Sequence, residues 1–244
     1  EAPYPTPENR TIAGPTFGYS LVSDRYEVVR GYRAWTLQED VNLGLTVDAS
    51  TVVSAPVFGG DRQRLVFATR AGYSIRRKNW LITGGTTATG RIERQHGLVN
   101  GLFGVELVAA QLGDRGVRAR LLIQDTWEPD TDVQLTLGAD LGLRGWQPDT
   151  FDGTGRALVN LEWRQLLVRE LWDVISVGAA VFADAGSTWH AQVAADSGGV
   201  RADIGVGLLI ELTKFSAQQL IRVEVGLPDD GSGALILVTT STLF

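Results

Sequence analysis

The sequence predicts an all-β protein, an antiparallel transmembrane β-barrel of about 12 strands. Strand-like runs of roughly 10–15 residues follow one another from Asp24 onward, and most of the breaks between them are rich in Gly, Pro, Asp or Ser. Several runs also alternate between apolar and polar residues, as half-buried strands do. Soluble sandwiches usually have strands of about 5–6 residues, so runs of about twice that length favour a membrane barrel.

The expected strands divide the chain into an extended, Pro-rich lead-in over residues 1–23, with a candidate edge segment at Thr16–Val22, and a barrel over residues 24–244. An even number of strands would put both termini on the same side of the membrane. The expected strands are Arg25–Leu37, Val41–Ala49, Arg62–Ile75, Asn79–Ile92, Leu98–Ala110, Val117–Thr126, Val133–Leu143, Ala157–Leu167, Ser176–Gly186, Arg201–Leu212, Leu220–Leu227 and Ala234–Phe244.

The alternation is clearest in Val133–Leu143, where Val, Leu and Ala occupy the odd positions and Gln, Thr, Gly and Asp the even ones. Arg201–Leu212 and Leu220–Leu227 also alternate, with charged residues and glycines on their polar face. Such a face suits a lumen in which Arg and Glu of neighbouring strands pair. Arg25–Leu37 and Asn79–Ile92 alternate poorly, and they are expected to be strands because of their length and their β-branched, aromatic and Thr content.

Composition excludes several classes of function. The chain has 244 residues, a net charge of −6 and no basic stripe, which argues against nucleic-acid binding. It has no Cys, so disulfides, thiol nucleophiles and Cys-based metal sites are excluded. Its histidines, His96 and His190, are far apart in sequence, and we predict no enzyme activity, no metal and no cofactor. Because the chain has no Met, we expect Glu1 to follow a cleaved or truncated segment.

Four blocks follow one another in the second half of the chain: Leu141–Trp146, Asn160–Arg164, Val181–Gly186, and Asp203–Gly207 with Arg222–Gly226. In this order they resemble the C-terminal barrel of the outer-membrane protein assembly factor superfamily, the BamA/TamA type or bacterial surface antigen family. The first is Leu-Gly-Leu-Arg-Gly-Trp, similar to a lid-loop motif that usually reads Val-Arg-Gly followed by Phe or Tyr, and Leu143 and Trp146 depart from it. The last expected strand stops at Phe244, which resembles the C-terminal aromatic barrel signal of bacterial outer-membrane barrels.

The resemblance covers about Val133–Phe244 and implies a bacterial outer-membrane location. It also implies a role in inserting or translocating other proteins, with outer-membrane lipid, lipopolysaccharide and client proteins as partners. The family's barrels have sixteen strands, preceded by periplasmic POTRA domains. With about twelve expected strands and no room for POTRA domains, we expect this chain to be a fragment or a product that lacks the first four strands.

The resemblance further implies that the lid loop, with Leu143, Arg144, Gly145 and Trp146 at its tip, folds back into the lumen. Arg144 would then pair with Glu162 and Asp184 on the inner wall, beside Phe182 and Gly186. Strand parity agrees with this, because Glu162 lies on a polar face and Asp184 shares a face with Phe182 and Gly186. Arginine suits the role, since its planar fork binds a carboxylate with two hydrogen bonds. The alternative is a solvated loop arginine.

Two other functions fit the same strands. One is a small-solute outer-membrane pore, which a lid loop over Arg144–Gly155 would obstruct. The other is a soluble β-barrel binding protein, which would stay in solution without detergent. The rows of Leu, Val and Ile on one face of the strands argue against the soluble protein.

Overall fold

The computed structural model describes residues 9–189, 199–213 and 220–240, and these residues confirm the all-β prediction. Their main feature is an antiparallel sheet of 11 strands, in the order β1-β4-β5-β6-β7-β8-β11-β12-β13-β14-β15. The strands of this sheet are β1 (Thr16–Val22), β4 (Gly44–Ser54), β5 (Arg64–Arg77), β6 (Trp80–Glu93), β7 (Gly97–Gln111), β8 (Arg115–Trp127), β11 (Gly155–Leu171), β12 (Ile175–Trp189), β13 (Arg201–Leu212), β14 (Leu220–Pro228) and β15 (Leu235–Thr239).

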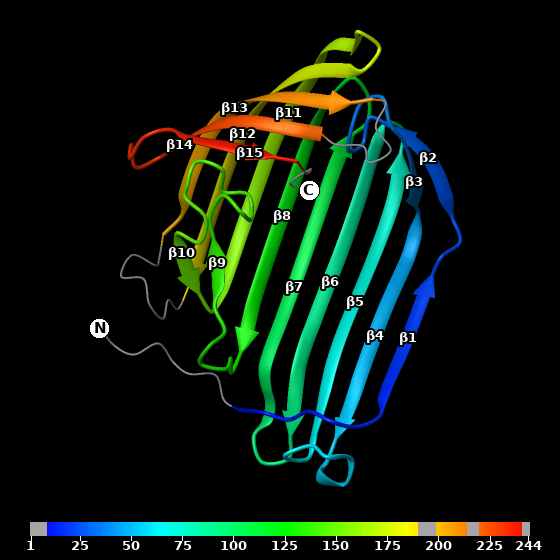
Figure 1. Cartoon of the computed structure of the whole chain (residues 1–244), viewed down its shortest axis with the longest axis vertical. Coiled ribbons are helices and arrows are strands. Elements are labelled where there is room, and N and C mark those ends of the chain that lie inside the picture. The colour runs from blue at the N-terminus through cyan, green and yellow to red at the C-terminus, as the bar shows by residue number, and fades with distance from the viewer. Residues whose placement is uncertain (1–8, 190–198, 214–219, 241–244) are drawn as a thin grey trace.

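Two short hairpins complete the described structure. β2 (Tyr26–Arg30) pairs with β3 (Gln38–Asn42), and β9 (Leu135–Leu137) pairs with β10 (Phe151–Gly153). A single 3₁₀ turn, Pro56–Phe58, follows β4. Figure 1 shows β4–β8 running side by side, while β13–β15 are strongly rotated relative to them, so that the sheet curls. No helix among the described residues is long and apolar enough to cross a membrane.

The sheet has two open edges in the described residues, since β1 pairs only with β4 and β15 only with β14. The expected closed barrel of about 12 strands is therefore not found. The described sheet has 11 strands, because neither Arg25–Leu37 nor Val133–Leu143 joins it, whereas the candidate edge segment Thr16–Val22 forms its first strand. With an odd number of strands, the described sheet begins at one end of its strands, at Thr16, and finishes at the opposite end, at Thr239.

The two expected strands that do not join the sheet, Arg25–Leu37 and Val133–Leu143, are interrupted for a physical reason. Only Tyr26–Arg30 of Arg25–Leu37 is extended, because the chain turns at Gly31, which has a φ of +72° that favours glycine. Val133–Leu143 is mostly loop, and Leu135, Leu137, Ala139 and Leu143 are buried inside the protein rather than on the outer side of a strand. These side chains are buried against the sheet by tertiary packing, so the alternation does not report strand pairing.

The two faces of the sheet differ in chemistry. We call the face that carries Asn160, Glu162 and Asp184 the inner face, and the opposite face the outer face. On the outer face, apolar side chains of six neighbouring strands stand in register: Val117, Trp163, Val181, Val206, Val225 and Ile236. All of these except Val225 are among the exposed large hydrophobic residues of the protein. A continuous apolar row of this kind is unusual on a surface that faces water.

The segment over residues 9–15 fastens the start of the chain to one end of the sheet. The Asp61 amide donates to the Thr11 carbonyl at 3.1 Å, and the Ala55 amide donates to the Ala13 carbonyl at 3.4 Å. Arg10 pairs with Asp130 at 2.9 Å. Figure 1 shows this segment crossing below the strands before β1 begins. The described part of the lead-in is therefore attached to the sheet.

We expect Asp130 to make part of the stability acid-sensitive. Arg91 donates two hydrogen bonds to its carboxylate, at 2.7 and 2.8 Å, and these hold the pKa of Asp130 below its usual 3.8 despite partial burial. A lowered pKa gives stability that is fully present above pH 3.8 and is lost as the pH falls through the folded-state pKa. Asp130→Asn should cost about 1 kcal/mol at pH 7 and should flatten unfolding curves measured below pH 4. If the stability of Asp130→Asn depends on pH below pH 4 as that of the wild type does, Asp130 is not a source of the acid sensitivity.

Candidate functional site

The loop between β9 and β10, residues 138–150, lies on the inner face and carries Arg144. In its first turn, the backbone amides of Leu141, Gly142 and Leu143 all donate to the same acceptor, the Gly138 carbonyl. Gly142 has a φ of +125°, a conformation that favours glycine. This tight turn points Arg144 at the wall formed by β11, β12 and β14.

Arg144 is fully buried and contacts three carboxylates. It donates two hydrogen bonds to Asp184, at 2.8 and 2.9 Å, one to Glu162 at 2.8 Å and one to Glu224 at 3.0 Å. Its guanidinium carbon also lies 3.6 Å from the centre of the Phe182 ring. Burial alone would lower the pKa of Arg144, but the hydrogen bonds from its guanidinium to Asp184 and the three negative charges raise it. Arg144 therefore stays charged in this position.

A second arginine, Arg222 on β14, completes the cluster. It binds Glu224 at 2.7 Å and also contacts Glu162, so these two carboxylates are shared between both arginines. Two cations facing the carboxylates of Glu162, Asp184 and Glu224 leave a net charge of −1. Asn160 joins the loop to this cluster, because its amide donates to the Gly142 carbonyl at 2.6 Å and to Asp184 at 2.7 Å. Charge pairing of this quality offsets much of the cost of burial.

An apolar cluster holds the rest of the loop. Trp146 and Phe151 meet edge to face with their centroids 4.9 Å apart, and they pack with Leu143 and other buried side chains of the loop and wall. Gly145 lies where a Cβ atom would meet Asp203 at 2.5 Å and the Pro228 backbone at 3.0 Å. Glycine is therefore required for the loop tip to approach β13 and β14. The cluster is Leu122, Leu137, Leu143, Trp146, Phe151 and Leu158.

We expect Gly145→Ala to destabilise the folded chain by about 1–3 kcal/mol, because the new methyl group would push the tip away from Asp203 and Pro228. The matched control is Gly18→Ala on β1, where the nearest atom to a new Cβ is 3.9 Å away. Urea unfolding of both variants checks the difference. Equal midpoints would show that the tip has room to move.

The structure brings four of the sequence-predicted site residues into direct contact: Arg144 with Glu162, Asp184 and Phe182. It contradicts the alternative of a solvated loop arginine, since Arg144 is 0% exposed. Gly186 lies beneath Leu137 rather than beside the arginine, and Leu143, Gly145 and Trp146 pack the loop as described above. Phe244 lies outside the described residues.

Sequence reasoning missed several residues of this wall. Glu224 and Arg222 alternate with apolar residues on β14, and this parity placed them on the polar face, but it did not predict that they join the cluster of Arg144. Arg164 on β11 and Glu211 on β13 share that inner parity and hold a second segment, residues 31–36. Nothing in the local sequence of residues 31–36 indicates that partner, since it lies more than a hundred residues away.

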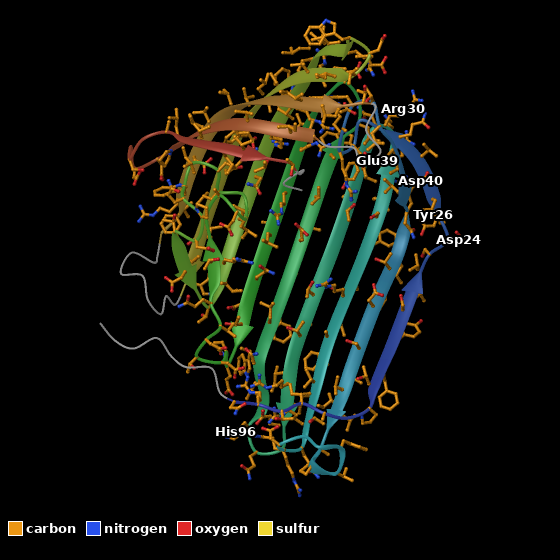
Figure 2. All side chains as sticks on the ribbon, in the orientation of Figure 1. Asp24, Tyr26, Arg30, Glu39, Asp40 and His96 are labelled. Atoms are coloured by element: carbon orange, nitrogen blue, oxygen red, sulfur yellow. The ribbon has the colours of Figure 1, made fainter. Side chains whose placement is uncertain are left out.

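The described residues contain no group of three or more His, Asp or Glu side chains arranged to hold a metal ion. His96 lies at the β6–β7 turn, at the end of the sheet opposite the β2–β3 hairpin (Figure 2). No protein-family model matches the chain, and a comparison with curated proteins finds no match. The functional interpretation therefore depends on the geometry of the sheet and its inner face.

Proposed function

We propose that this chain is an outer-membrane β-barrel protein of the protein-assembly and translocation type, whose lid loop is held against the inner wall by Arg144. Its partners would be outer-membrane lipid, lipopolysaccharide and client proteins. The observation that carries the proposal is the complete burial of Arg144 among Glu162, Asp184 and Glu224 on the inner face of a sheet whose outer face is apolar.

The outer face supports a lipid environment. The apolar row through Trp163, Val181 and Val206 is bordered by further exposed apolar residues, among them Leu161, Ile204 and Leu227 in the neighbouring register. β4–β8, β11 and β12 contain 11–17 residues each, and a membrane strand needs about 9–11. Transfer of this surface from water to lipid would be favourable by about 25 cal/mol per Å² of apolar area removed from water.

The open edges at β1 and β15 must be covered in the proposed membrane state. In hydrocarbon, each unpaired backbone N–H or C=O group costs several kcal/mol, roughly, so an open sheet is not stable there. If the two edges of one chain pair with each other, the compact species has the mass of one chain. If a second copy covers the edges, the compact species has the mass of two chains. A semi-native gel distinguishes them, because an unheated compact band runs at the mass of one chain or of two.

In this proposal the lid loop keeps the interior of the barrel filled while the seam between the first and last strands opens to clients. The loop reaches from β8, where Arg120 donates to the Leu141 carbonyl at 2.9 Å, to Glu224 on β14, so its release would free the faces of β11, β12 and β14 together. Arg144 holds the loop through charge-assisted hydrogen bonds to a small set of carboxylates. Such an attachment suits a loop that is either fully bound to the wall or fully released from it.

The experiment that tests the proposal has two parts. First, refolding into detergent should give an unheated compact band, and a chain that stays monodisperse without detergent would be the soluble binding protein instead. Second, vesicles that contain the chain should accelerate the insertion of a urea-denatured eight-stranded outer-membrane barrel several-fold over empty vesicles. A compact band without acceleration would retain the barrel and overturn the assembly role.

A small-solute pore is the second candidate, and the other half of the inner face favours it. There β4–β7 carry small polar residues, and a cavity of about 320 Å³ is lined by Thr46, Gly72, Gly85 and Thr87, among others. Planar-bilayer conductance checks this candidate. Steady channels in the wild type, with no assembly activity, would favour the pore.

A further inference from the structure

The β2–β3 hairpin is an arm attached to the edge of the sheet. In the described residues β2 pairs only with β3, and the hairpin continues the β1–β4 pair through residues 23–25 and 43–44, where Gly44 has a φ of +123°. Figure 2 places Tyr26, Arg30, Glu39 and Asp40 along this arm, with Asp24 at its base. Tyr26 and Val28 are 58% and 59% exposed, whereas Val29 is 2% exposed, so one side of the arm faces the surroundings. Glu27 also pairs with Arg76 of β5 at 3.0 Å. The tip, residues 31–36, makes the strong contacts.

Arg164 on β11 binds the backbone of this tip. Its guanidinium donates to the carbonyl oxygens of Gly31, Tyr32 and Arg33, at 2.6, 2.5 and 3.0 Å. The Arg164 side chain is buried, and no carboxylate of the described residues lies within ion-pair distance of it. Three carbonyl dipoles of the tip thus take the place that a carboxylate would occupy.

Glu211 on β13 binds Trp35 and Thr36 of the tip, and it acts as an acceptor where Arg164 acts as a donor. Its carboxylate accepts from the backbone amides of Trp35 and Thr36, both at 3.0 Å, and from the Thr36 hydroxyl at 2.5 Å. Glu211 is buried too. Apart from that hydroxyl, Arg164 and Glu211 recognise main-chain groups, which every peptide carries.

The Trp35 ring fills a slot in the same wall. It packs with Leu166, Ala180, Leu209 and Leu220. A Cβ atom on Gly178 would lie 2.1 Å from the ring, so the slot exists because residue 178 is glycine. The wall of β11–β14 therefore offers a cation for carbonyls, a carboxylate for amides, and a deep slot for one aromatic side chain.

We propose that this wall is a binding site for an extended peptide segment with one aromatic residue, and that the chain's own tip occupies it as a tethered ligand. When the arm turns about residues 23–25 and 43–44, a segment of another protein takes the same place. Empty, the site would leave Arg164 and Glu211 buried without partners, which is costly, so one peptide should replace the other. This inference goes beyond the proposed function and does not depend on it.

The test uses the full chain with residues 31–36 replaced by six Gly and Ser residues, in whichever medium keeps the wild type compact. The probe is a fluorescein-labelled, end-blocked peptide with the sequence Gly-Tyr-Arg-Ala-Trp-Thr, followed by fluorescence anisotropy. We expect saturable binding to the tip-replaced chain and binding at least about tenfold weaker to the wild type, whose site is filled. Equal binding to both, or no binding to a folded tip-replaced chain, would overturn the proposal.

Variants of probe and protein separate this site from nonspecific association. Changing Trp to Ala in the peptide, or methylating the Trp backbone nitrogen, should weaken binding by about tenfold or more, because each removes one contact of Trp35. Arg164→Leu in the tip-replaced chain should do the same, whereas Arg70→Ala, on the inner face of β5 away from the tip, should not. If Arg164→Leu and Arg70→Ala both abolish binding, or if neither does, the proposed site is wrong.

If the tip-replaced chain fails to stay compact, Trp35→Ala in the otherwise intact chain tests the slot. N-acetyltryptophanamide at millimolar concentration should raise the melting temperature of this variant by a few degrees and leave the wild type unchanged. No difference between the two proteins would overturn the proposal.

Discussion

Replacing Arg144 with Ala is expected to lower the free energy of unfolding by about 3–5 kcal/mol. The substitution leaves Glu162, Asp184 and Glu224 buried with Arg222 as the remaining cation of the cluster, and Asp184 loses both hydrogen bonds from the guanidinium. It also removes the anchor of the loop over residues 138–150. The measurement is the temperature at which the unheated compact band disappears from a semi-native gel, or the urea midpoint of tryptophan fluorescence.

Arg70→Ala is the matched control, because Arg70 is an inner-face arginine of β5 that lines the uncovered half of the sheet. Arg144→Lys should fall between the wild type and Arg144→Ala, since a lysine keeps the charge but cannot form the paired hydrogen bonds to Asp184. Adding Asp184→Asn to Arg144→Ala should recover part of the loss by removing one stranded charge. Equal midpoints for Arg144→Ala and Arg70→Ala would refute the cluster as a source of stability.

Placing an arginine at Val206 is expected to cost about 2–4 kcal/mol in a lipid bilayer. Val206 lies near the middle of β13 on the outer face and is 57% exposed, at the centre of the apolar row. In water, the same change at a half-exposed position should cost about 0.5 kcal/mol or less. The size of the effect therefore reports the solvent on the outer face independently of any assay of function.

Ile92→Arg provides the depth control. Ile92 is 48% exposed on the outer face, but it is the second-last residue of β6, close to the end of the sheet. At a membrane interface an arginine costs only about 0–1 kcal/mol. Reversible unfolding from lipid vesicles should thus separate Val206→Arg from Ile92→Arg, and equally small effects at both positions would rule out a bilayer around this face.

Period-two alternation predicted most of the sheet correctly, because strand parity is a local property of the backbone. The inner positions of β11, β13 and β14 were assigned from sequence, and the structure buries Glu162, Asp203 and Glu224 as that assignment requires. Alternation failed in Val133–Leu143, where the alternating side chains pack as a loop. The pattern reports that the two sides of a segment meet different surroundings, and it does not report whether a neighbouring strand supplies hydrogen bonds.

The candidate site was also predicted only in part from the sequence. Motif and parity, together with the family resemblance, predicted that Arg144 would meet Glu162 and Asp184, and the structure brings these three side chains together. Glu224 and Arg222 reach the cluster because the sheet curves, and no local sequence pattern describes this curvature. The contacts of residues 31–36 with Arg164 and Glu211 join positions more than a hundred residues apart, through backbone groups that leave no trace in side-chain chemistry.

The sequence by itself thus determined the all-β class, the two unlike faces of the strands and the arginine at the tip of the loop. All of these depend on residue type and spacing along one segment. Only the tertiary structure decided that the sheet of the described residues has two open edges, that a second segment fills part of the inner wall, and that two arginines share one set of carboxylates. These features depend on how distant segments meet, and that is fixed by packing and long-range hydrogen bonds.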